Sequence, residues 1–397
     1  MKTIYILFFA VALVSCGRSS RTNINTIQTE KGDVKQFTID ADEVFEIEKV
    51  LEEPTFVKLE TKPECLIGTI DKLICTDSLI VVVDRRVAQA VFVFDSAGRF
   101  LGKIAEKGKG PGEFTEIWDV NINEESRHIE LLDEKLKKIN KYTYECRYVD
   151  YKRMPFIFTG YQPLDSSTFA YYTNKSPNAR QPIINNNLLV TAKSNNKILG
   201  KAFPLTQNEK NNSMSFETFN APLWKYGKSV FFNPRFSDTI FRVTPNKLFA
   251  EYIVKMRGMI SSANWEKMDN ERFQKLLETH SYLNGTFIDL QDHSYVNVTT
   301  PKGRVHGFYL KSSGKVISGR SFSTINPFYN FFEIPLAAKS NNSFVVVQTA
   351  QQILDAKALI NMSIKTKSPK IQEELKVFSK LSKDDNPILV FFKAKKV

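Results

Sequence analysis

The sequence predicts an all-β protein built from a repeated unit of short antiparallel strands, and three observations support this. Aromatic residues, which favour strands, are abundant, with 31 phenylalanines and 14 tyrosines in 397 residues. Short apolar runs recur along most of the chain and are separated by turn residues. One strand–turn–strand pattern returns after 49 residues, a period typical of β-propeller blades.

The repeated unit is clearest in the first third of the chain. Residues Leu79–Asp84 form an apolar run that ends in an acid, and Val91–Asp95 repeats that form before a turn at 96–98. Asp and Gly stabilise tight turns, so this turn and the strand after it predict a hairpin. Residues Ile129–Asp133 match the first run, 49 residues further along. About four short strands in each period predict a β-propeller.

Later units are less regular but continue the β pattern. Further strands are expected at 168–173, 188–193, 229–232, 239–243, 249–255, 307–310, 314–317, 343–347 and 388–392. Apolar residues at helical spacing predict short helical insertions within Ser262–Leu283 and at Ile371–Phe378, and Gln351–Ala358 is a third candidate.

Residues 1–15 have the pattern of a secretory signal peptide. Lys2 precedes an unbroken apolar stretch from Ile4 to Val14, which is too short to cross a bilayer as a helix. The run Leu13-Val14-Ser15-Cys16 resembles the lipobox of bacterial lipoproteins. That resemblance implies that Cys16 carries lipid, such as palmitate, and begins the mature chain. The alternative is an ordinary signal peptide with a chance cysteine.

The mature chain is expected to have two parts. Residues 16–36 are predicted to be a lipidated flexible tether, because Gly17–Val34 is polar and buries nothing. Residues 37–397 are predicted to form the propeller as one domain. Cys65, Cys75 and Cys146 lie within it, and three thiols cannot all pair internally. A Cys65–Cys75 disulfide and unpaired core thiols both remain open.

The charge of the chain gives no sign of a nucleic-acid partner. Its formal net charge is +12, and removal of Lys2 with the signal peptide leaves +11. Lysines and arginines are scattered and form no long basic block, and an exported protein rarely meets nucleic acid. The basic excess therefore indicates a solvated surface with mild affinity for anionic surfaces.

Four motifs spread over nearly the whole mature chain point to one family. They are Val57–Thr61 with Leu66–Ile70, Gly108-Lys109-Gly110-Pro111-Gly112-Glu113-Phe114, Phe236–Val243 and Asp384–Val390. Together they resemble the opening strand, the G-x-G-P-G-E-[FY] signature, the central strand and the closing strand of a six-bladed β-propeller lipoprotein family of Gram-negative bacteria, which is related to NHL-type propellers. The resemblance implies six blades, closed by pairing Thr55–Glu60 with Ile388–Phe392. It transfers no catalytic residues.

The glycine-rich motif is predicted to be a structural loop between blades. Gly108, Gly110 and Gly112 permit tight backbone conformations, and Pro111 fixes φ. Glu113 and Phe114 complete the motif. A phosphate-binding loop is excluded because this segment lies between β units and lacks the Lys-Ser/Thr pair that such a loop requires.

The sequence offers no catalytic, metal or cofactor site. His128, His280, His293 and His306 accompany no zinc-binding spacing. No G-x-S-x-G elbow is present. A glycosidase or lyase pair among acids such as Glu113, Glu116, Asp119, Asp133 and Asp238 stays open.

We therefore expect a membrane-anchored envelope lipoprotein whose propeller is a binding module for a peptide, a glycan or an envelope protein. The alternative is a metal-assisted lyase or hydrolase with its site at the channel mouth. The segment Gly17–Arg21 lacks the acidic residues that direct some lipoproteins to the cell surface. This favours an outer-membrane anchor that faces the periplasm.

Overall fold

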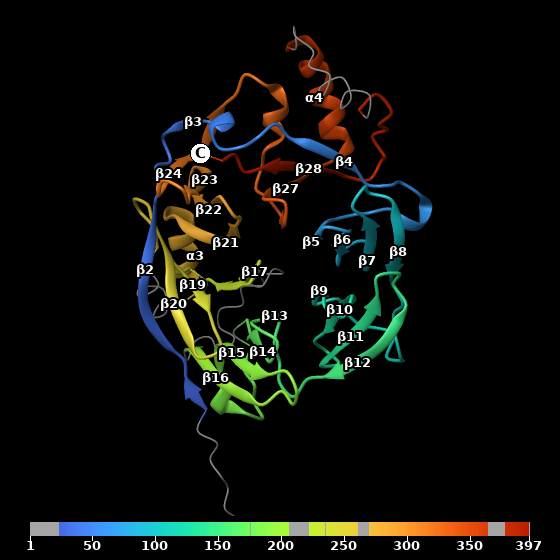
Figure 1. Ribbon diagram of the computed structural model, residues 1–397, viewed down its shortest axis with the longest axis vertical. Helices are drawn as coiled ribbons and strands as arrows, with labels where there is room; N and C mark the ends of the chain where they lie inside the picture. Colours follow the sequence, from blue (N-terminus) through green and yellow to red (C-terminus); the bar gives the residue numbers. More distant parts are fainter. Residues whose placement is uncertain are drawn as a thin grey trace, which may run out of the picture.

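The computed structural model describes residues 24–174, 176–205, 222–234, 236–260, 270–363 and 378–396. Within them, six sheets, each containing four antiparallel strands, stand around a central axis (Figure 1). Each sheet is one blade, and short helices are inserted between strands. The prediction of an all-β, six-bladed propeller with short helical insertions is confirmed.

Consecutive segments build the blades, and the first strand of each blade lies nearest the axis (Figure 1). Blade 1 consists of β5 (Lys72–Cys75), β6 (Leu79–Asp84), β7 (Ala90–Asp95) and β8 (Phe100–Ile104). Blade 2 consists of β9 (Asp119–Asn123), β10 (His128–Asp133), β11 (Lys138–Thr143) and β12 (Tyr148–Arg153). Blade 3 consists of β13 (Gly160–Pro163), β14 (Thr168–Tyr172), β15 (Asn186–Ala192) and β16 (Ile198–Pro204). Blade 4 consists of β17 (Leu223–Tyr226), β18 (Ser229–Phe232), β19 (Thr239–Val243) and β20 (Lys247–Lys255). Blade 5 consists of β21 (Tyr282–Asp289), β22 (His293–Thr300), β23 (Gly303–Leu310) and β24 (Lys315–Gly319). Blade 6 consists of β26 (Ala337–Lys339), β27 (Ser343–Gln348), β28 (Ile388–Lys393) and, from the N-terminal part of the chain, β4 (Thr55–Lys58).

The 49-residue period has a physical origin in blades 1 and 2. Asp84 and Asp133 end the second strand of their blades and are fully buried. The Asp84 carboxylate accepts the backbone N–H of Thr69 at 2.9 Å, and Asp133 accepts that of Thr115 at 2.6 Å. Burial raises the pKa of Asp84, but backbone N–H donors such as that of Thr69 outweigh burial and leave this pKa lowered. In these two blades, the repeated acid therefore holds the segment that enters the blade.

Pairing of the two ends of the chain closes the ring, as predicted. Strand β4 lies antiparallel to β28, with Phe56 opposite Val390. Asn386, just before β28, donates to the carbonyl oxygens of Glu60 and Cys65 at 2.7 and 2.8 Å and accepts the N–H of Ile67 at 2.9 Å. Blade 6 is thereby tied to the segment that leads into blade 1.

The segment before blade 6 differs from the expected tether. Strand β1 (Asn25–Thr26) pairs in parallel with β16, and β2 (Gln28–Thr38) with β20. Strand β3 (Val44–Glu46) pairs in parallel with β25 (Ser321–Ser323). We call residues 25–46 the N-terminal belt, because it runs along the outside of blades 3, 4 and 5 (Figure 1).

The expected boundary at residue 36 is therefore wrong, and the strands begin at Asn25. The belt is polar because an outermost strand is stabilised mainly by backbone hydrogen bonds to a sheet edge, which any side chain permits. Only a few of its side chains, such as Ile27 and Phe37, enter the core. A polar outer strand therefore looks like a flexible segment in the sequence.

The bounds of the helical insertions differ from the expected ranges. Helix α3 (Asn270–Thr279) lies within the predicted range 262–283, whose last two residues belong to β21. Helix α4 (Ala350–Ser363) contains the candidate at 351–358. The candidate at 371–378 lies outside the described residues except for Phe378, which is buried against Phe56 with ring centroids 4.9 Å apart. Four 3-10 turns also occur among the described residues: η1 (Ile47–Lys49), η2 (Pro63–Cys65), η3 (Pro182–Ile184) and η4 (Pro327–Phe331).

Neighbouring blades pack through apolar faces that form the core. Between blades 2 and 3 the contact is largely aromatic, and the rings of Phe158 and Tyr171 lie 4.7 Å apart in an edge-to-face arrangement. Burial of such rings is the main stabilising contribution between blades. In the part of the chain that the structure describes, no helix is long and apolar enough to cross a membrane.

Candidate functional site

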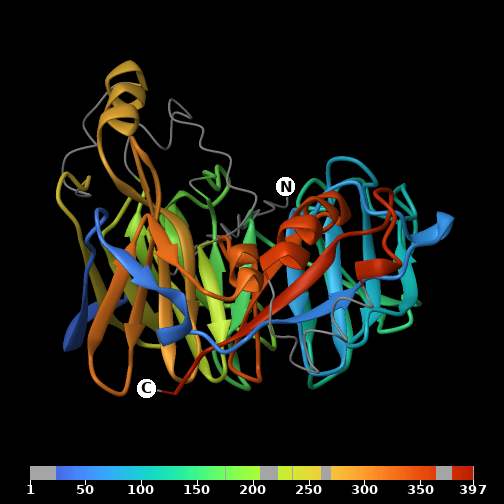
Figure 2. The ribbon, with the colours of Figure 1, turned by 90° about the horizontal axis from the view of Figure 1, so that it is seen from above.

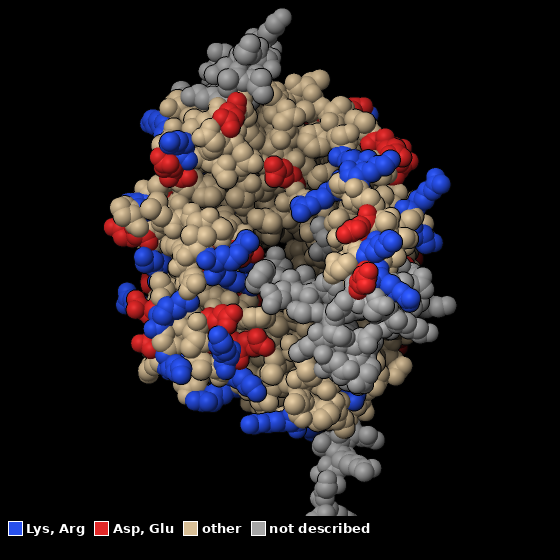
Figure 3. All heavy atoms as spheres, turned by 180° about the vertical axis from the view of Figure 1, so that it is seen from behind, with Lys and Arg blue, Asp and Glu red and all other residues tan. Residues whose placement is uncertain are grey.

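A cavity of about 940 Å³ occupies the centre of the ring. Residues on the innermost strands of all six blades, β5, β9, β13, β17, β21 and β26, line it. Seen from behind, the molecule has a hollow near its centre with charged side chains on the surrounding surface (Figure 3). A central concave site with polar and aromatic lining is where a propeller of this size is expected to bind a ligand.

Strand direction divides the propeller into two faces. On one face, which we call the inner-turn face, the innermost strand of each blade turns into the second strand. On the other, the crossover face, the outermost strand of one blade connects to the next blade. Helices α3 and α4 also connect strands on the crossover face, and both lie in the upper part of Figure 2, whereas the C-terminal end lies at the bottom.

Ion pairs fix part of the cavity wall. Lys72 of blade 1 contacts the Asp119 carboxylate of blade 2 at 2.6 Å. In blade 5, Lys311 contacts Asp289 at 2.8 Å, and Asp289 also accepts the Ser294 hydroxyl at 2.6 Å. These charges are satisfied by the protein itself, so they shape the wall rather than attract a ligand.

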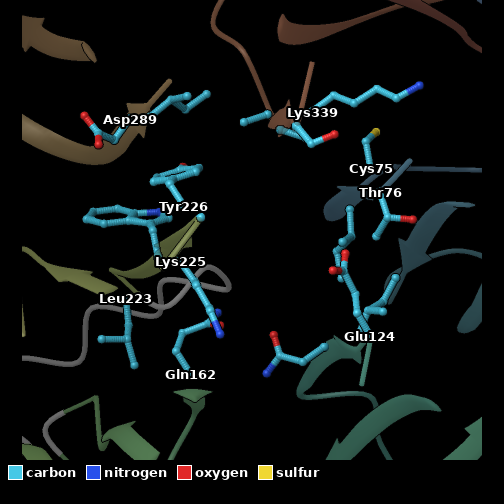
Figure 4. Close-up of a pocket in the computed structure, with 18 of the residues that line it drawn as sticks. Cys75, Thr76, Glu124, Gln162, Leu223, Lys225, Tyr226, Asp289 and Lys339 are labelled. Atoms are coloured by element: carbon cyan, nitrogen blue, oxygen red, sulfur yellow. The ribbon is translucent and has the colours of Figure 1, made fainter. Parts of the chain in front are cut away.

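Other charged side chains at the inner-turn face have no such partners. Glu124 and Glu125 lie in the exposed turn after β9, Lys225 is exposed on β17, and Lys193 follows β15. None of the four forms a salt bridge within the described residues. Figure 4 shows Lys225 on one wall of the cavity and Glu124 on the opposite wall.

Lys225 lies in an environment that disfavours its charge. Burial lowers its pKa, and the neighbouring Lys193 ammonium lowers it further, while the Glu124 carboxylate acts in the opposite sense. Lys225 is therefore near enough to Lys193 and Glu124 for their charges to act on it. A ligand anion beside Lys193 and Lys225 would relieve this repulsion.

Aromatic side chains provide the apolar part of the cavity. Trp224, Tyr226 and Phe287 line it, and the Tyr226 hydroxyl donates to the Phe287 carbonyl oxygen at 2.7 Å. The indole ring of Trp224 lies 5.7 Å from the Phe287 ring, measured between centroids. This cluster joins blades 4 and 5 and gives the wall a rigid surface for stacking.

A smaller hollow of about 280 Å³ extends between blades 2 and 3. Glu130, which is only 8% exposed, lies in both hollows and accepts the hydroxyl of buried Tyr161. Lys152 also lines this side pocket and donates to the Lys193 carbonyl oxygen at 3.2 Å. The two hollows therefore share Glu130 and Tyr161 on their walls.

The glycine-rich motif does not line the cavity. It follows β8, so it lies on the crossover face, and none of its residues is in the cavity wall. The Glu113 carboxylate accepts the Gly110 N–H at 2.8 Å, and Phe114 is fully buried between blades 1 and 2. Pro111 lies between Gly110 and Gly112 at the tip of this loop.

Two glycines of the motif occupy positions that a larger residue would not tolerate. Gly108 has φ +153°, and a Cβ there would lie 1.9 Å from the Glu113 carboxylate. Gly112 has φ +75° and packs on the Tyr148 ring. These contacts support the interpretation of the motif as a structural loop.

The predicted carboxylates do not gather at one point. Asp119 lines the cavity but is paired with Lys72, whereas Asp133 caps a loop on the crossover face. Glu116 is paired with Lys135 at 3.6 Å, and Asp238 accepts the Thr239 hydroxyl.

The four histidines also lie apart. His293 is buried and contacts the Val50 carbonyl oxygen at 3.0 Å, and His306 contacts the Tyr295 hydroxyl at 2.8 Å. His280 is exposed after α3, and His128 lines only the side pocket. Among the described residues, no three His, Cys, Asp or Glu side chains are arranged to hold a metal ion.

The cysteines of the propeller are free thiols. Cys65 and Cys75 are buried, and Cys146 is partly buried. Burial raises the pKa of Cys75 to about 12, and it raises that of Cys146 to about 12 with a further contribution from Glu145. Of the two alternatives left open by the sequence, the structure therefore has unpaired thiols. Cys16 lies outside the described residues.

Sequence reasoning missed the residues that face each other across the cavity. Glu124, Lys193 and Lys225 come from three different blades and share no motif. In the sequence, these residues are marked only by lying at or just after the end of a strand. Many exposed residues occupy such positions, so the position alone does not identify a site.

Fold and site together define a six-bladed β-propeller with a polar, aromatic-lined central cavity. The chain belongs to the family described as "Domain of unknown function (DUF4934)", whose model matches residues 32–393. The comparison with curated proteins finds no match.

Solved structures agree on the fold. The crystal structure of a "putative exported protein" from Bacteroides fragilis is 18% identical, with a TM-score of 0.70, and the alignment covers 91% of this chain and 100% of that one. A member of the DUF4221 family from Bacteroides vulgatus is 10% identical, with a TM-score of 0.49 and coverage of 87% and 98%. At such identities, only the likeness to the first structure is informative, and it concerns the fold alone.

Proposed function

We propose that this protein is an exported lipoprotein, anchored through lipid on Cys16, whose propeller binds a ligand in its central cavity. The ligand is a peptide, a glycan or a segment of another envelope protein. The lipobox-like run that ends at Cys16 supports the anchor. The description of the Bacteroides fragilis structure as an exported protein supports export. The sequence motifs support a relation to NHL-type propellers.

One observation carries the binding function. The cavity presents charged side chains from blades 2, 3 and 4, namely Glu124, Lys193 and Lys225, that have no ion-pair partners within the described residues. A few charged side chains beside an aromatic wall in a central cavity are typical of a recognition site.

The belt determines how far the propeller lies from the membrane. Strand β1 begins at Asn25, so about nine residues connect it to Cys16. Such a segment spans at most about 30 Å when fully extended. The lipid then lies within about 30 Å of the outer edge of blade 3, where β1 pairs with β16.

Membrane fractionation tests the anchor. Cys16→Ser is expected to move the protein from the membrane to the soluble fraction, because stable anchoring requires the acyl chains. A variant that stays in the membrane fraction would show that another anchor exists. Protease treatment of intact cells tests the leaflet: a periplasm-facing protein is protected, and rapid loss would contradict the proposed orientation.

A variant that fills the cavity tests whether the ligand binds there. Gln162→Trp adds bulk to the wall, and Gln181→Trp is the matched control, since Gln181 is exposed on the same blade outside the cavity. Full-length protein in detergent is tested on glycan arrays and on capped hexapeptide libraries. Retention that Gln162→Trp abolishes and Gln181→Trp preserves supports the proposal. Retention that both variants preserve would place binding elsewhere.

A further inference from the structure

The inner-turn face carries opposite charges on opposite walls of the cavity. Lysines of blades 3 and 4 lie on one wall and acids of blades 1 and 2 on the other, although Asp165 also lines the cavity from blade 3 and Lys339 from blade 6. The lysines are Lys193 and Lys225, and the acids are Glu124, Glu125 and Asp77. Figure 4 shows Lys225 and Glu124 facing the same open space from these two sides.

Among the described residues, no ion pair neutralises Lys193, Lys225, Glu124 or Glu125. Lys193 Nζ lies over the Phe169 ring, 4.8 Å from its centroid, and makes no salt bridge within the described residues. Lys225 likewise has no carboxylate partner there, and repulsion from Lys193 contributes to its lowered pKa. Of the acids, Asp77 accepts the Ser340 hydroxyl, whereas Glu124 and Glu125 have no ion-pair partner in the described part of the chain.

The acidic wall continues into the cavity beyond these exposed groups. Asp119 and the buried Glu130 stand on the same blade as Glu124. Asp119 is paired with Lys72, and Glu130 accepts a hydrogen bond from the Tyr161 hydroxyl. A ligand that lies in the cavity therefore meets Lys193 and Lys225 on one side and the exposed Glu124 and Glu125 on the other, while Asp119 and Glu130 already have partners in the protein.

We propose that the cavity mouth on the inner-turn face binds a short peptide segment that carries both acidic and basic side chains. Its acidic groups lie beside Lys193 and Lys225, and its basic groups lie beside Glu124 and Glu125. This inference rests on the proposed binding function and names its ligand class. Charge complementarity on two walls also fixes the direction in which the peptide lies.

A peptide fits this arrangement better than an acidic glycan. A glycan with carboxylate groups would pair with Lys193 and Lys225 but would bring like charge towards Glu124 and Glu125. A neutral glycan would leave both sets of charges without partners. Peptides commonly carry groups of both signs on one short chain, and the wall of Trp224 and Tyr226 offers apolar contact for their side chains.

The test is selection from a hexapeptide library on the immobilised full-length protein. Both ends of each peptide are capped, so that charge comes from side chains alone, and retained peptides are sequenced by mass spectrometry. Peptides with both signs are expected to be enriched about tenfold over peptides with one sign, a difference of about 1.4 kcal/mol. A second library with free ends distinguishes a free peptide from an internal protein segment.

Charge inversion identifies the side chains. Lys225→Glu is expected to reduce retention of the selected peptides about tenfold and to shift selection towards basic peptides. Lys228→Glu is the matched control, because Lys228 is exposed in the turn after β17 but does not line the cavity. Equal behaviour of the two variants, or selection of peptides with one sign only, overturns the proposal.

Two further outcomes separate this inference from the proposed function. Retention of uronate-containing oligosaccharides that Lys225→Glu abolishes, without peptide enrichment, would overturn the peptide inference and leave binding in the cavity intact. Retention of neither class would count against the binding function itself.

Discussion

Replacing Asn386 with alanine is expected to destabilise the closed ring by about 3 kcal/mol. The side chain is only 3% exposed, and its amide makes three hydrogen bonds to backbone groups of the segment between blades 6 and 1. Each such bond contributes about 1 kcal/mol, and buried backbone groups left without partners cost at least as much. The loss falls on the junction that closes the ring.

Equilibrium urea unfolding followed by tryptophan fluorescence measures this change. Asn341→Ala, at an exposed turn position, is the control and is expected to change the free energy of unfolding by less than about 0.5 kcal/mol. Asn386→Asp keeps the shape and the acceptor but loses both donations, so it is also expected to be destabilised. A loss below about 1 kcal/mol in Asn386→Ala, or a stable Asn386→Asp, would refute the reasoning.

Three further predictions concern the loop, pH and closure. Gly108→Ala is expected to cost about 1–3 kcal/mol, because its Cβ meets Glu113, whereas Gly227→Ala, with open space around it, costs less; thermal melts compare them. Burial lowers the pKa of His306 from 6.5 to about 4, so stability is expected to be full above pH 6.5 and to fall towards pH 4, and His306→Gln should flatten this decline in urea titrations at each pH. Truncation before Pro387 removes β28 and is expected to abolish the cooperative melting transition; an unchanged melt would contradict closure by this strand.

The repeat could be predicted from local patterns, whereas the pairing that closes the ring was expected from the resemblance to a propeller family. Asp84 and Asp133 end equivalent strands, and a carboxylate at such a position must find donors close in sequence. The closing strand was predictable because Ile388–Phe392 is apolar on both faces, as expected of a strand inside a sheet, and all five side chains are buried in the structure. The helix at 350–363 was a weaker prediction, since short apolar runs fit both helix and strand.

The belt could not be predicted in the same way. Residues 25–36 carry few apolar side chains, and their order comes from parallel pairing with β16 and β20, about 170–220 residues away in the chain. Nothing in a polar segment indicates which sheet edge it will meet. The tether assigned to it was therefore too long.

The sequence by itself determined the all-β class and the blade period, because both depend on strand patterning and turn chemistry within a few residues. The closing strand pair was expected from the resemblance to a propeller family. Tertiary structure alone decided the cavity and its opposed charges. Glu124, Lys193 and Lys225 lie on three blades, and only closure of the ring brings these side chains around one space. Their chemistry depends on distances between blades, and a single sequence does not encode such distances in any local pattern.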